Sequence, residues 1–220
     1  MIVKLLNQIQ ENELIKVIKK LLYSAYNKYF RYRYQVITLK KVELSELGID
    51  NELFHYHSFT DYLDFRTAMK GLRITPRRDV FIDFGSGMGA VIAMAATYPF
   101  FKIIGIETSP ELNAIAKDLI ERNKKRLQCK NIELVEGDAA LFMIPPEATV
   151  FYLYNPFHGT VLDAVVKNIK ESITNNPRKI TLIFKNPIYF EKIGGLSDWL
   201  IEKRRFTCYW EHDCVVYEKN

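Results

Sequence analysis

The chain has 220 residues, of which 48% are hydrophobic and 13% are aromatic. This length and composition allow a full hydrophobic core and exclude an intrinsically disordered protein. The formal net charge of +5 is a mild positive bias and gives only weak support for a polyanionic partner.

The cysteine pattern and the distribution of apolar residues bear on compartment and membrane location. Cys129, Cys208 and Cys214 form neither a zinc-binding spacing nor a CxxC motif. We therefore expect no metal site built on cysteine, and a reducing compartment, the cytoplasm. The first residues lack the apolar core of a signal peptide and no apolar run reaches 18 residues, so we expect no membrane span.

Residues 1–75 are predicted to form a helical N-terminal extension. Apolar residues recur at helical spacing from Leu14 to Ala25, and residues 16–41 carry eight Lys or Arg, no Asp or Glu, and several tyrosines. Such a segment can bind RNA, because cations contact phosphates and tyrosines stack on bases. The preferred alternative is a helix that packs its Tyr and Leu face on the core and leaves Lys and Arg in solvent.

The end of this extension contains candidate site residues. His55 and His57 are two residues apart and could ligate a metal or act as acid–base groups, but no third ligand appears at a suitable spacing. The same segment leads directly into the first strand, so we expect it to cover the ligand pocket. Tyr62 and Arg66, one helical turn apart, are the candidate covering side chains.

A glycine-rich turn follows the first predicted strand. The apolar run of residues 79–84 ends there, and Gly85, Gly87 and Gly89 precede an apolar helical pattern over residues 90–96. A buried strand, a tight turn and a helix N-terminus together form the place where open α/β sheets bind nucleotides. The turn also fits the G-x-G-x-x-G/A pattern of dinucleotide-binding proteins, so alone it does not identify the ligand.

Acidic residues lie close to the carboxyl ends of the first three predicted strands. Asp83 precedes the glycine turn, Glu107 ends the strand of residues 102–107, and Asp138 follows the strand of residues 131–135. An acid at the end of a second strand can accept hydrogen bonds from both hydroxyls of a ribose. Glu107 could instead be a helix N-terminal acid, and Asp138 could belong to an ordinary turn.

Further strands complete the predicted sheet. The buried apolar runs at 149–154 and 179–184 are predicted to be the fourth and fifth strands. Residues 205–210 and 214–217 alternate between apolar and polar and are predicted to form a C-terminal hairpin. Asn155, directly after the fourth strand, would point into the ligand cleft. His158 and His212 are possible bases, although a lone surface histidine seldom has a catalytic role.

The order of these motifs resembles the class I, Rossmann-like S-adenosylmethionine-dependent methyltransferases. The likeness covers roughly residues 75–220 and rests on four motifs: Asp83 to Gly89, Glu107, Glu136-Gly137-Asp138 and Asn155-Pro156-Phe157. By this resemblance, the glycine turn would pass beside the methionyl part of the cofactor, with Asp83 at its amino group. Glu107 would bind the ribose hydroxyls, and Asp138 with Ala139 the adenine. The implied cofactor-binding residues are Asp83, Gly85, Ser86, Gly87, Gly89, Glu107, Thr108, Asp138, Ala139, Asn155 and Tyr62.

The turn after the fourth strand bears on the methyl acceptor. Asn155-Pro156-Phe157 is similar to a shortened form of the Asn/Asp-Pro-Pro-Tyr/Phe motif of methyltransferases that act on amino groups. In that motif the Asn side chain and a proline carbonyl accept hydrogen bonds from the target nitrogen, and the aromatic ring packs near the methyl group. We therefore expect these three residues to be catalytic and a nitrogen of a protein or small molecule to be methylated. Methylation of RNA through residues 16–41 and a non-catalytic cofactor-binding scaffold are the alternatives.

The predicted fold is α/β: a Rossmann-like, seven-stranded, mostly parallel sheet with a C-terminal antiparallel hairpin and helices on both faces. It would occupy residues 76–220, after the extension of residues 1–75. A dinucleotide is a less suitable ligand than S-adenosylmethionine, because Asp83 would repel a pyrophosphate and attract a cationic cofactor. Methyl transfer of this kind requires no metal, and S-adenosylhomocysteine would be the cofactor product.

Overall fold

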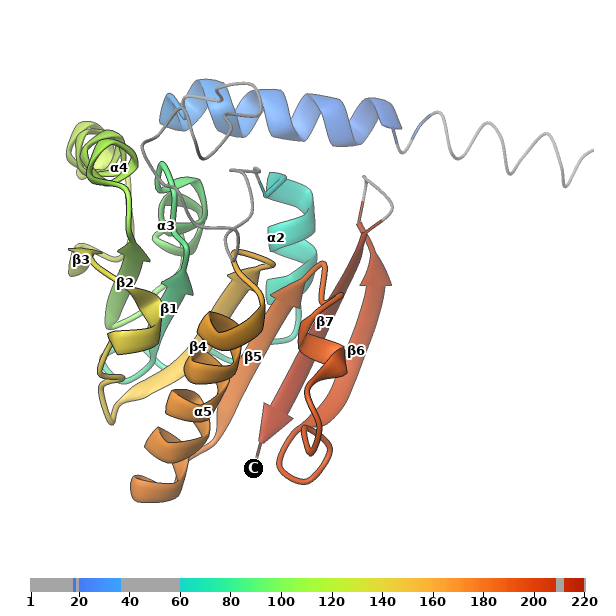
Figure 1. Ribbon diagram of the computed structural model, residues 1–220. Helices are drawn as coiled ribbons and strands as arrows, with labels where there is room; N and C mark the ends of the chain where they lie inside the picture. Colours follow the sequence, from blue (N-terminus) through green and yellow to red (C-terminus); the bar gives the residue numbers. More distant parts are fainter. Residues whose placement is uncertain (1–17, 19, 37–59, 209–211, 220) are drawn as a thin grey trace, which may run out of the picture.

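The computed structural model describes residues 18, 20–36, 60–208 and 212–219. Seven strands in these ranges form one sheet in the order β3-β2-β1-β4-β5-β7-β6 (Figure 1). The strands are β1 (Val80–Phe84), β2 (Lys102–Glu107), β3 (Ile132–Glu136), β4 (Ala148–Tyr154), β5 (Ile180–Lys185), β6 (Ile201–Thr207) and β7 (Asp213–Lys219).

The sheet is parallel except at its C-terminal edge. Strands β1 to β5 pair in parallel, whereas β7 is antiparallel to both β5 and β6. Because β1, β2, β4 and β5 are parallel neighbours, their carboxyl ends, with the predicted site residues, meet at one end of the sheet. The predicted seven-stranded, mostly parallel fold is confirmed.

The last hairpin starts earlier than predicted. β6 begins at Ile201 rather than 205, and β7 begins at Asp213 rather than 214. β6 is an edge strand, and its first residues are exposed and charged, so they lack the apolar alternation on which the sequence prediction depended.

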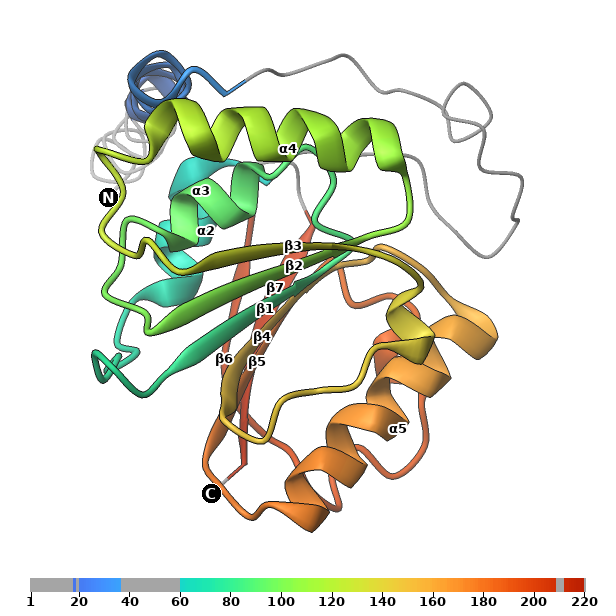
Figure 2. The same cartoon turned by 90° about the vertical axis from the view of Figure 1, so that its left-hand side faces the viewer.

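Helices cover both faces of the sheet (Figure 2). One face packs against α5 (Gly159–Asn175) and the 3-10 helices η2 (Ala139–Leu141) and η3 (Phe190–Lys192). The other face packs against a helix of residues 20–34, α2 (Tyr62–Met69), α3 (Ala90–Ala95) and α4 (Pro110–Asn123). Since the sheet is covered twice, all five residues of β1 are buried, which is why its sequence is a continuous apolar run interrupted only by Asp83.

The helix of residues 20–34 shares its core with the sheet. Phe30 is buried and stacks on Tyr62, with ring centroids 4.3 Å apart. The Asn27 amide donates a hydrogen bond to Asp61 at 2.9 Å. These contacts join the helix of residues 20–34 to α2 and its N-cap. The proposed division between residues 75 and 76 stays a prediction.

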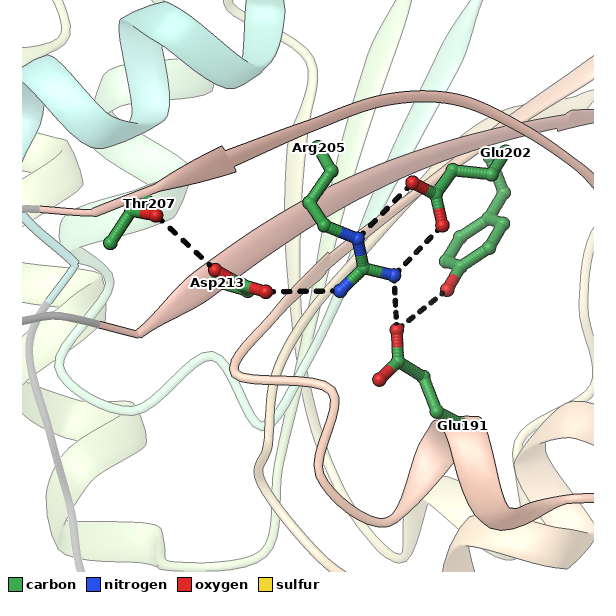
Figure 3. A network of polar contacts seen from close by, with 6 residues as sticks. Glu191, Glu202, Arg205, Thr207 and Asp213 are labelled. Carbon is green, nitrogen blue, oxygen red and sulfur yellow. Dashed lines mark hydrogen bonds and ion pairs between the residues drawn. The ribbon is translucent and has the colours of Figure 1, made fainter.

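A surface network holds the C-terminal hairpin against η3 (Figure 3). The Arg205 guanidinium contacts three carboxylates, at 2.8 Å for Glu202 and 3.0 Å for Asp213, with Glu191 as the third. These hydrogen bonds raise the pKa of Arg205 further above its already high value. The groups are well exposed, so water and salt screen their contribution to stability.

Among the helices in the described ranges, none combines the length and the apolar character needed to cross a bilayer.

Candidate active site

The glycine turn has a backbone that other residues would not tolerate. Gly85, Gly87 and Gly89 have positive φ angles of 77°, 52° and 79°. A Cβ atom on Gly85 would lie 2.5 Å from Cβ of Pro156, and one on Gly89 would lie 2.8 Å from Cβ of Ala116. Glycine is therefore needed both for the conformation and for close packing on the Asn-Pro turn and on α4.

Glu107 connects the glycine turn to the start of α4. Its carboxylate accepts hydrogen bonds from the backbone N–H of Gly87 at 2.8 Å and of Ser109 at 3.0 Å. Burial raises the pKa of Glu107, an effect larger than the opposing one of the hydrogen bonds from Ser109, Gly87 and Thr108. Each carboxylate oxygen has two lone pairs, so Glu107 can still accept hydrogen bonds from a ligand.

Asp83 is a buried acid beneath the turn. It is 2% exposed, and within the described residues no hydrogen bond reaches its carboxyl group. Burial, and secondarily the negative charge of Glu107, raise the pKa of Asp83 well above its ordinary value. Burial of a carboxyl group without a partner costs free energy of folding. A cationic or hydrogen-bond-donating ligand would offset that cost.

The end of β3 contributes Asp138 and Ala139. The Asp138 carboxylate caps η2 by accepting a hydrogen bond from the N–H of Ala140 at 2.8 Å, and Ala139 is buried. The N–H of Gly137 donates to the carbonyl of Glu107 at 3.0 Å, which ties the ends of β2 and β3 together. One oxygen of Asp138 therefore has a local structural partner, and the other is available to a ligand.

The three residues of the predicted catalytic turn differ in their surroundings: Asn155 and Pro156 lie beside the glycine turn, and Phe157 lies in the core. Asn155 has a positive φ of 39°, is 8% exposed, and its side-chain oxygen has no hydrogen-bond partner within the described structure. Pro156 packs against Gly85, so this turn and the glycine turn are in direct contact. Phe157 is only 1% exposed and belongs to the core on the α5 face, where its ring is a packing residue.

The other predicted residues contact neighbouring aromatic rings or lie outside the described residues, and their roles stay predictions. Tyr62 stacks on Phe30 and packs on the core of the α3 face, a role that the sequence did not suggest. His158 precedes α5, with its ring centroid 4.9 Å from that of Tyr189. His55 and His57 lie outside the described residues. Within the described residues no three His, Cys, Asp or Glu side chains are grouped as metal ligands.

The structure adds a buried ion pair that the sequence analysis missed. Lys185, the last residue of β5, is 0% exposed, and its ammonium lies 2.9 Å from Asp64 of α2. The same ammonium is 4.4 Å from the ring centroid of Tyr154, the last residue of β4, and the Tyr23 hydroxyl donates to Asp64. Burial alone would lower the pKa of Lys185, but Tyr154 and Asp64 raise it overall. In the sequence, the signal for this ion pair was Lys185 itself, a charged residue at the end of the mostly apolar strand β5.

Two comparisons address the family and the fold. Residues 77–154 match a family model described as "Putative methyltransferase". The fold resembles that of an S-adenosylmethionine-dependent methyltransferase from Aquifex aeolicus, with a TM-score of 0.55, 15% identity, and coverage of 82% of this chain and 100% of that one.

Residues 77–154 thus resemble putative methyltransferases, and the chain has the Rossmann-like fold of the class I S-adenosylmethionine-dependent methyltransferases. S-adenosylmethionine is the cofactor of this class.

Two more similar proteins are informative. An RNA methyltransferase from Salinibacter ruber, solved with S-adenosylhomocysteine, has a TM-score of 0.50 and 20% identity, over 74% of this chain and 92% of that one. An uncharacterised protein from Methanocaldococcus jannaschii is 34% identical over 100 residues, which are 44% of this chain. This match spans only 36% of the length of the Methanocaldococcus protein, about a third.

Proposed function

We propose that the protein transfers a methyl group from S-adenosylmethionine to a nitrogen atom of a protein or small-molecule substrate. The observation that carries this proposal is the side chain of Asn155. Its amide oxygen is buried and has no partner among the described residues, and it lies on a strained turn that packs directly against the glycine turn. An acceptor held in this way suits the N–H of a bound nitrogen nucleophile.

The residues around the glycine turn fit the cofactor. The buried Asp83 carboxyl, which has no hydrogen bond from the described residues, suits the positively charged amino group. The lone pairs that Glu107 does not use for Gly87 and Ser109 suit the ribose hydroxyls. The oxygen of Asp138 that does not cap η2 suits the adenine amino group, beside the buried Ala139.

Catalysis in this proposal is mainly positioning. When bound, S-adenosylmethionine supplies a methyl group on a sulfonium sulfur; the nitrogen lone pair forms the N–C bond, the C–S bond breaks with its electrons going to sulfur, and S-adenosylhomocysteine and a proton are released. Asn155 orients the nitrogen by accepting its N–H, so that the lone pair faces the methyl group. Pro156, packed on Gly85, fixes the distance between that amide and the glycine turn.

RNA is the second candidate substrate, supported by the exposed side of the helix of residues 20–34. Tyr29 and Tyr32 are 61% and 86% exposed. On the same helix, Lys28 is exposed and Arg33 is half-buried. Exposed tyrosines among cations suit stacking on bases and contacts with phosphates. The Salinibacter relative is described as an RNA methyltransferase, which agrees with this alternative.

We also infer a reducing compartment such as the cytoplasm. All three cysteines are free thiols, and each of them is buried. Unpaired cysteines of this kind suit a reducing environment.

A methyl-transfer screen tests the proposal. Cell lysate is separated into protein, RNA and small-molecule fractions, and each is incubated with the protein and radiolabelled S-adenosylmethionine. We expect label in the protein or small-molecule fraction, and at least a tenfold loss of transfer for Asn155→Gly, which keeps the backbone free to adopt a positive φ. Label confined to RNA, with binding that weakens steeply as salt rises, would replace the nitrogen proposal by the RNA alternative.

A further inference from the structure

An open cavity of about 390 Å³ lies at the end of the sheet opposite the candidate active site. It is lined by the segment after α2, by the first residues of β4 and β5, and by the last residues of β7. Because β4 and β5 run parallel to β1, their amino ends lie at the far end of the sheet from the glycine turn. The volume falls within the range of roughly 300–1,000 Å³ that is typical of small-molecule sites.

The cavity exists because α2 stops short of this end of the sheet. α2 ends at Met69, and the chain turns at Gly71, which has a φ of 87° and lines the cavity. Val150, which lies in the core on the α2 side of the sheet, also lines it, and so does Thr181, which pairs with Glu218 of β7. The face that α2 covers further along the strands is therefore open to a ligand here.

Three cationic side chains line this cavity without a partner. Arg73 follows α2, Lys179 precedes β5, and Lys219 is the last residue of β7. Within the described residues, no hydrogen bond or ion pair reaches the side chain of any of the three. Their charges are therefore available to a ligand.

The two carboxylates that line the same cavity already have partners. Asp79 accepts hydrogen bonds from the N–H of Thr75 at 2.7 Å and from the hydroxyl of Thr149 at 3.2 Å. The carboxylate of Glu218 lies 3.9 Å from the ammonium of Lys203, on β6. Three unpaired cations thus stand against two partnered acids, so the cavity favours a negatively charged ligand.

The remaining lining residues describe the rest of that ligand. Leu72 and Ile74 are half-buried and Val150 and Ile180 are buried, so apolar surface lies beside the cations. A guanidinium binds a carboxylate or a phosphate through two parallel N–H bonds, and an ammonium adds a point charge. A small molecule with an anionic group on an apolar body matches both parts of the lining.

We propose that this cavity is a second ligand site, which binds a small organic anion. The carboxylate or phosphate group contacts Arg73, Lys179 and Lys219, and the apolar body packs against Leu72 and Ile74. Since the site and the glycine turn lie at opposite ends of the sheet, both can be occupied at the same time. The inference assumes nothing about the methyl acceptor and stands apart from the proposed function.

The test is a calorimetric titration with four probes, each with and without S-adenosylhomocysteine. Phenyl phosphate and benzoate carry an anionic group on an apolar ring, inorganic phosphate lacks the ring, and benzyl alcohol lacks the charge. We expect millimolar or tighter binding of at least one of the two organic anions, unchanged by S-adenosylhomocysteine. It should be about threefold or more tighter than that of inorganic phosphate or benzyl alcohol. The comparison of phenyl phosphate with benzoate shows which anionic group the site prefers.

Three variants locate the binding. Arg73→Gln and Lys179→Gln each remove one charge from an exposed side chain, and we expect each to weaken binding of the organic anion by about threefold or more. Lys167→Gln, on the exposed face of α5, changes the net charge by the same amount and is the matched control. It should bind the anion as the wild type does. Thermal melting establishes that each variant is folded.

Several results would overturn the inference. These are failure of the wild-type protein to bind either organic anion at millimolar concentration, and unchanged binding in both Arg73→Gln and Lys179→Gln. An equal loss in Lys167→Gln would show that net charge alone attracts the anion. Competition by S-adenosylhomocysteine would place the anion in the cofactor site. Equally tight binding of inorganic phosphate would refute the contribution of the apolar surface and with it an organic ligand.

Discussion

At the scale of single residues, Asp83 has the least favourable position for a charge. Burial and Glu107 raise the pKa of its carboxyl above the ordinary value of 3.8. The folded protein therefore retains a proton on Asp83 that the unfolded chain releases, so the contribution of this group to stability is fully present below its ordinary pKa and declines as the pH rises through its folded pKa.

The first prediction follows from the loss of stability that ionisation of Asp83 causes as the pH rises. Asp83→Asn removes the ionisation, so we expect it to raise the melting temperature by a few degrees at pH 8 and to change it little at pH 4. Asp118→Asn, an exposed carboxylate on α4, is the control and should show no such pH dependence. The same Asp83→Asn protein should bind S-adenosylmethionine at least tenfold more weakly, because asparagine cannot release a proton to form the carboxylate that pairs with the charged amino group. An equal stability change at both pH values would contradict the account.

Asp138 allows its structural and ligand-binding roles to be separated. Asp138→Asn retains an oxygen that can cap η2 through the N–H of Ala140, but replaces the other oxygen with an N–H donor. We predict nearly unchanged stability and at least tenfold weaker binding of S-adenosylhomocysteine for Asp138→Asn, measured by melting and calorimetry. Binding close to that of the wild type would show that Asp138 is a capping residue only.

At the scale of elements, the contact between the glycine turn and the Asn-Pro turn leaves no room for a side chain at Gly85. In Gly85→Ala, the new Cβ would lie 2.5 Å from Cβ of Pro156, at a φ of 77°. We predict that Gly85→Ala lowers the free energy of unfolding by about 2 kcal/mol or more and abolishes measurable cofactor binding. Gly71→Ala is the control, since Gly71 also has a positive φ but has open space around its Cβ position. Similar effects of the two substitutions would assign the cost to the backbone conformation rather than to the contact.

The Lys185–Asp64 pair joins β5 to α2 inside the protein. Asp64→Asn would leave the Lys185 ammonium buried without its counter-ion, and we predict a loss of about 3–5 kcal/mol in the free energy of unfolding by chemical denaturation. Lys185→Met with Asp64→Leu removes both charges and should recover most of that loss. If the double variant is as unstable as Asp64→Asn, the cost comes from lost packing rather than from the unpaired charge.

Much of the element structure could be predicted from the sequence. The buried parallel strands are apolar runs, and the acids that follow them are visible because they interrupt those runs. The partners of Asp64 could not be predicted, since Tyr23 is 41 positions away and Lys185 is 121 positions away. Contacts over such distances depend on how the helices pack on the sheet, which local periodicity does not encode.

The same contrast applies to the site. The strand-end positions of Asp83, Glu107 and Asp138 follow from local patterns. The burial of Phe157 in the α5 core and the stacking of Tyr62 on Phe30 do not, because an aromatic residue beside a motif looks the same whether it faces ligand or core.

At the scale of the whole molecule, the sheet and its two helical layers form one structure that concentrates the candidate site at the carboxyl ends of β1, β2, β3 and β4. The helix of residues 20–34 belongs to the same core through Phe30, so this helix is part of the described fold and is available to contribute to substrate selection. Its exposed tyrosines face away from that core, where a macromolecular substrate could reach them.

Cofactor binding is tested most directly by calorimetric titration of the purified protein with S-adenosylmethionine, S-adenosylhomocysteine and NAD in parallel. We predict micromolar dissociation constants for the two sulfur ligands and no binding of NAD, because the buried Asp83 carboxyl, two residues before Gly85, suits a cationic ligand and not a pyrophosphate. Binding of NAD without binding of the sulfur ligands would contradict the proposed cofactor.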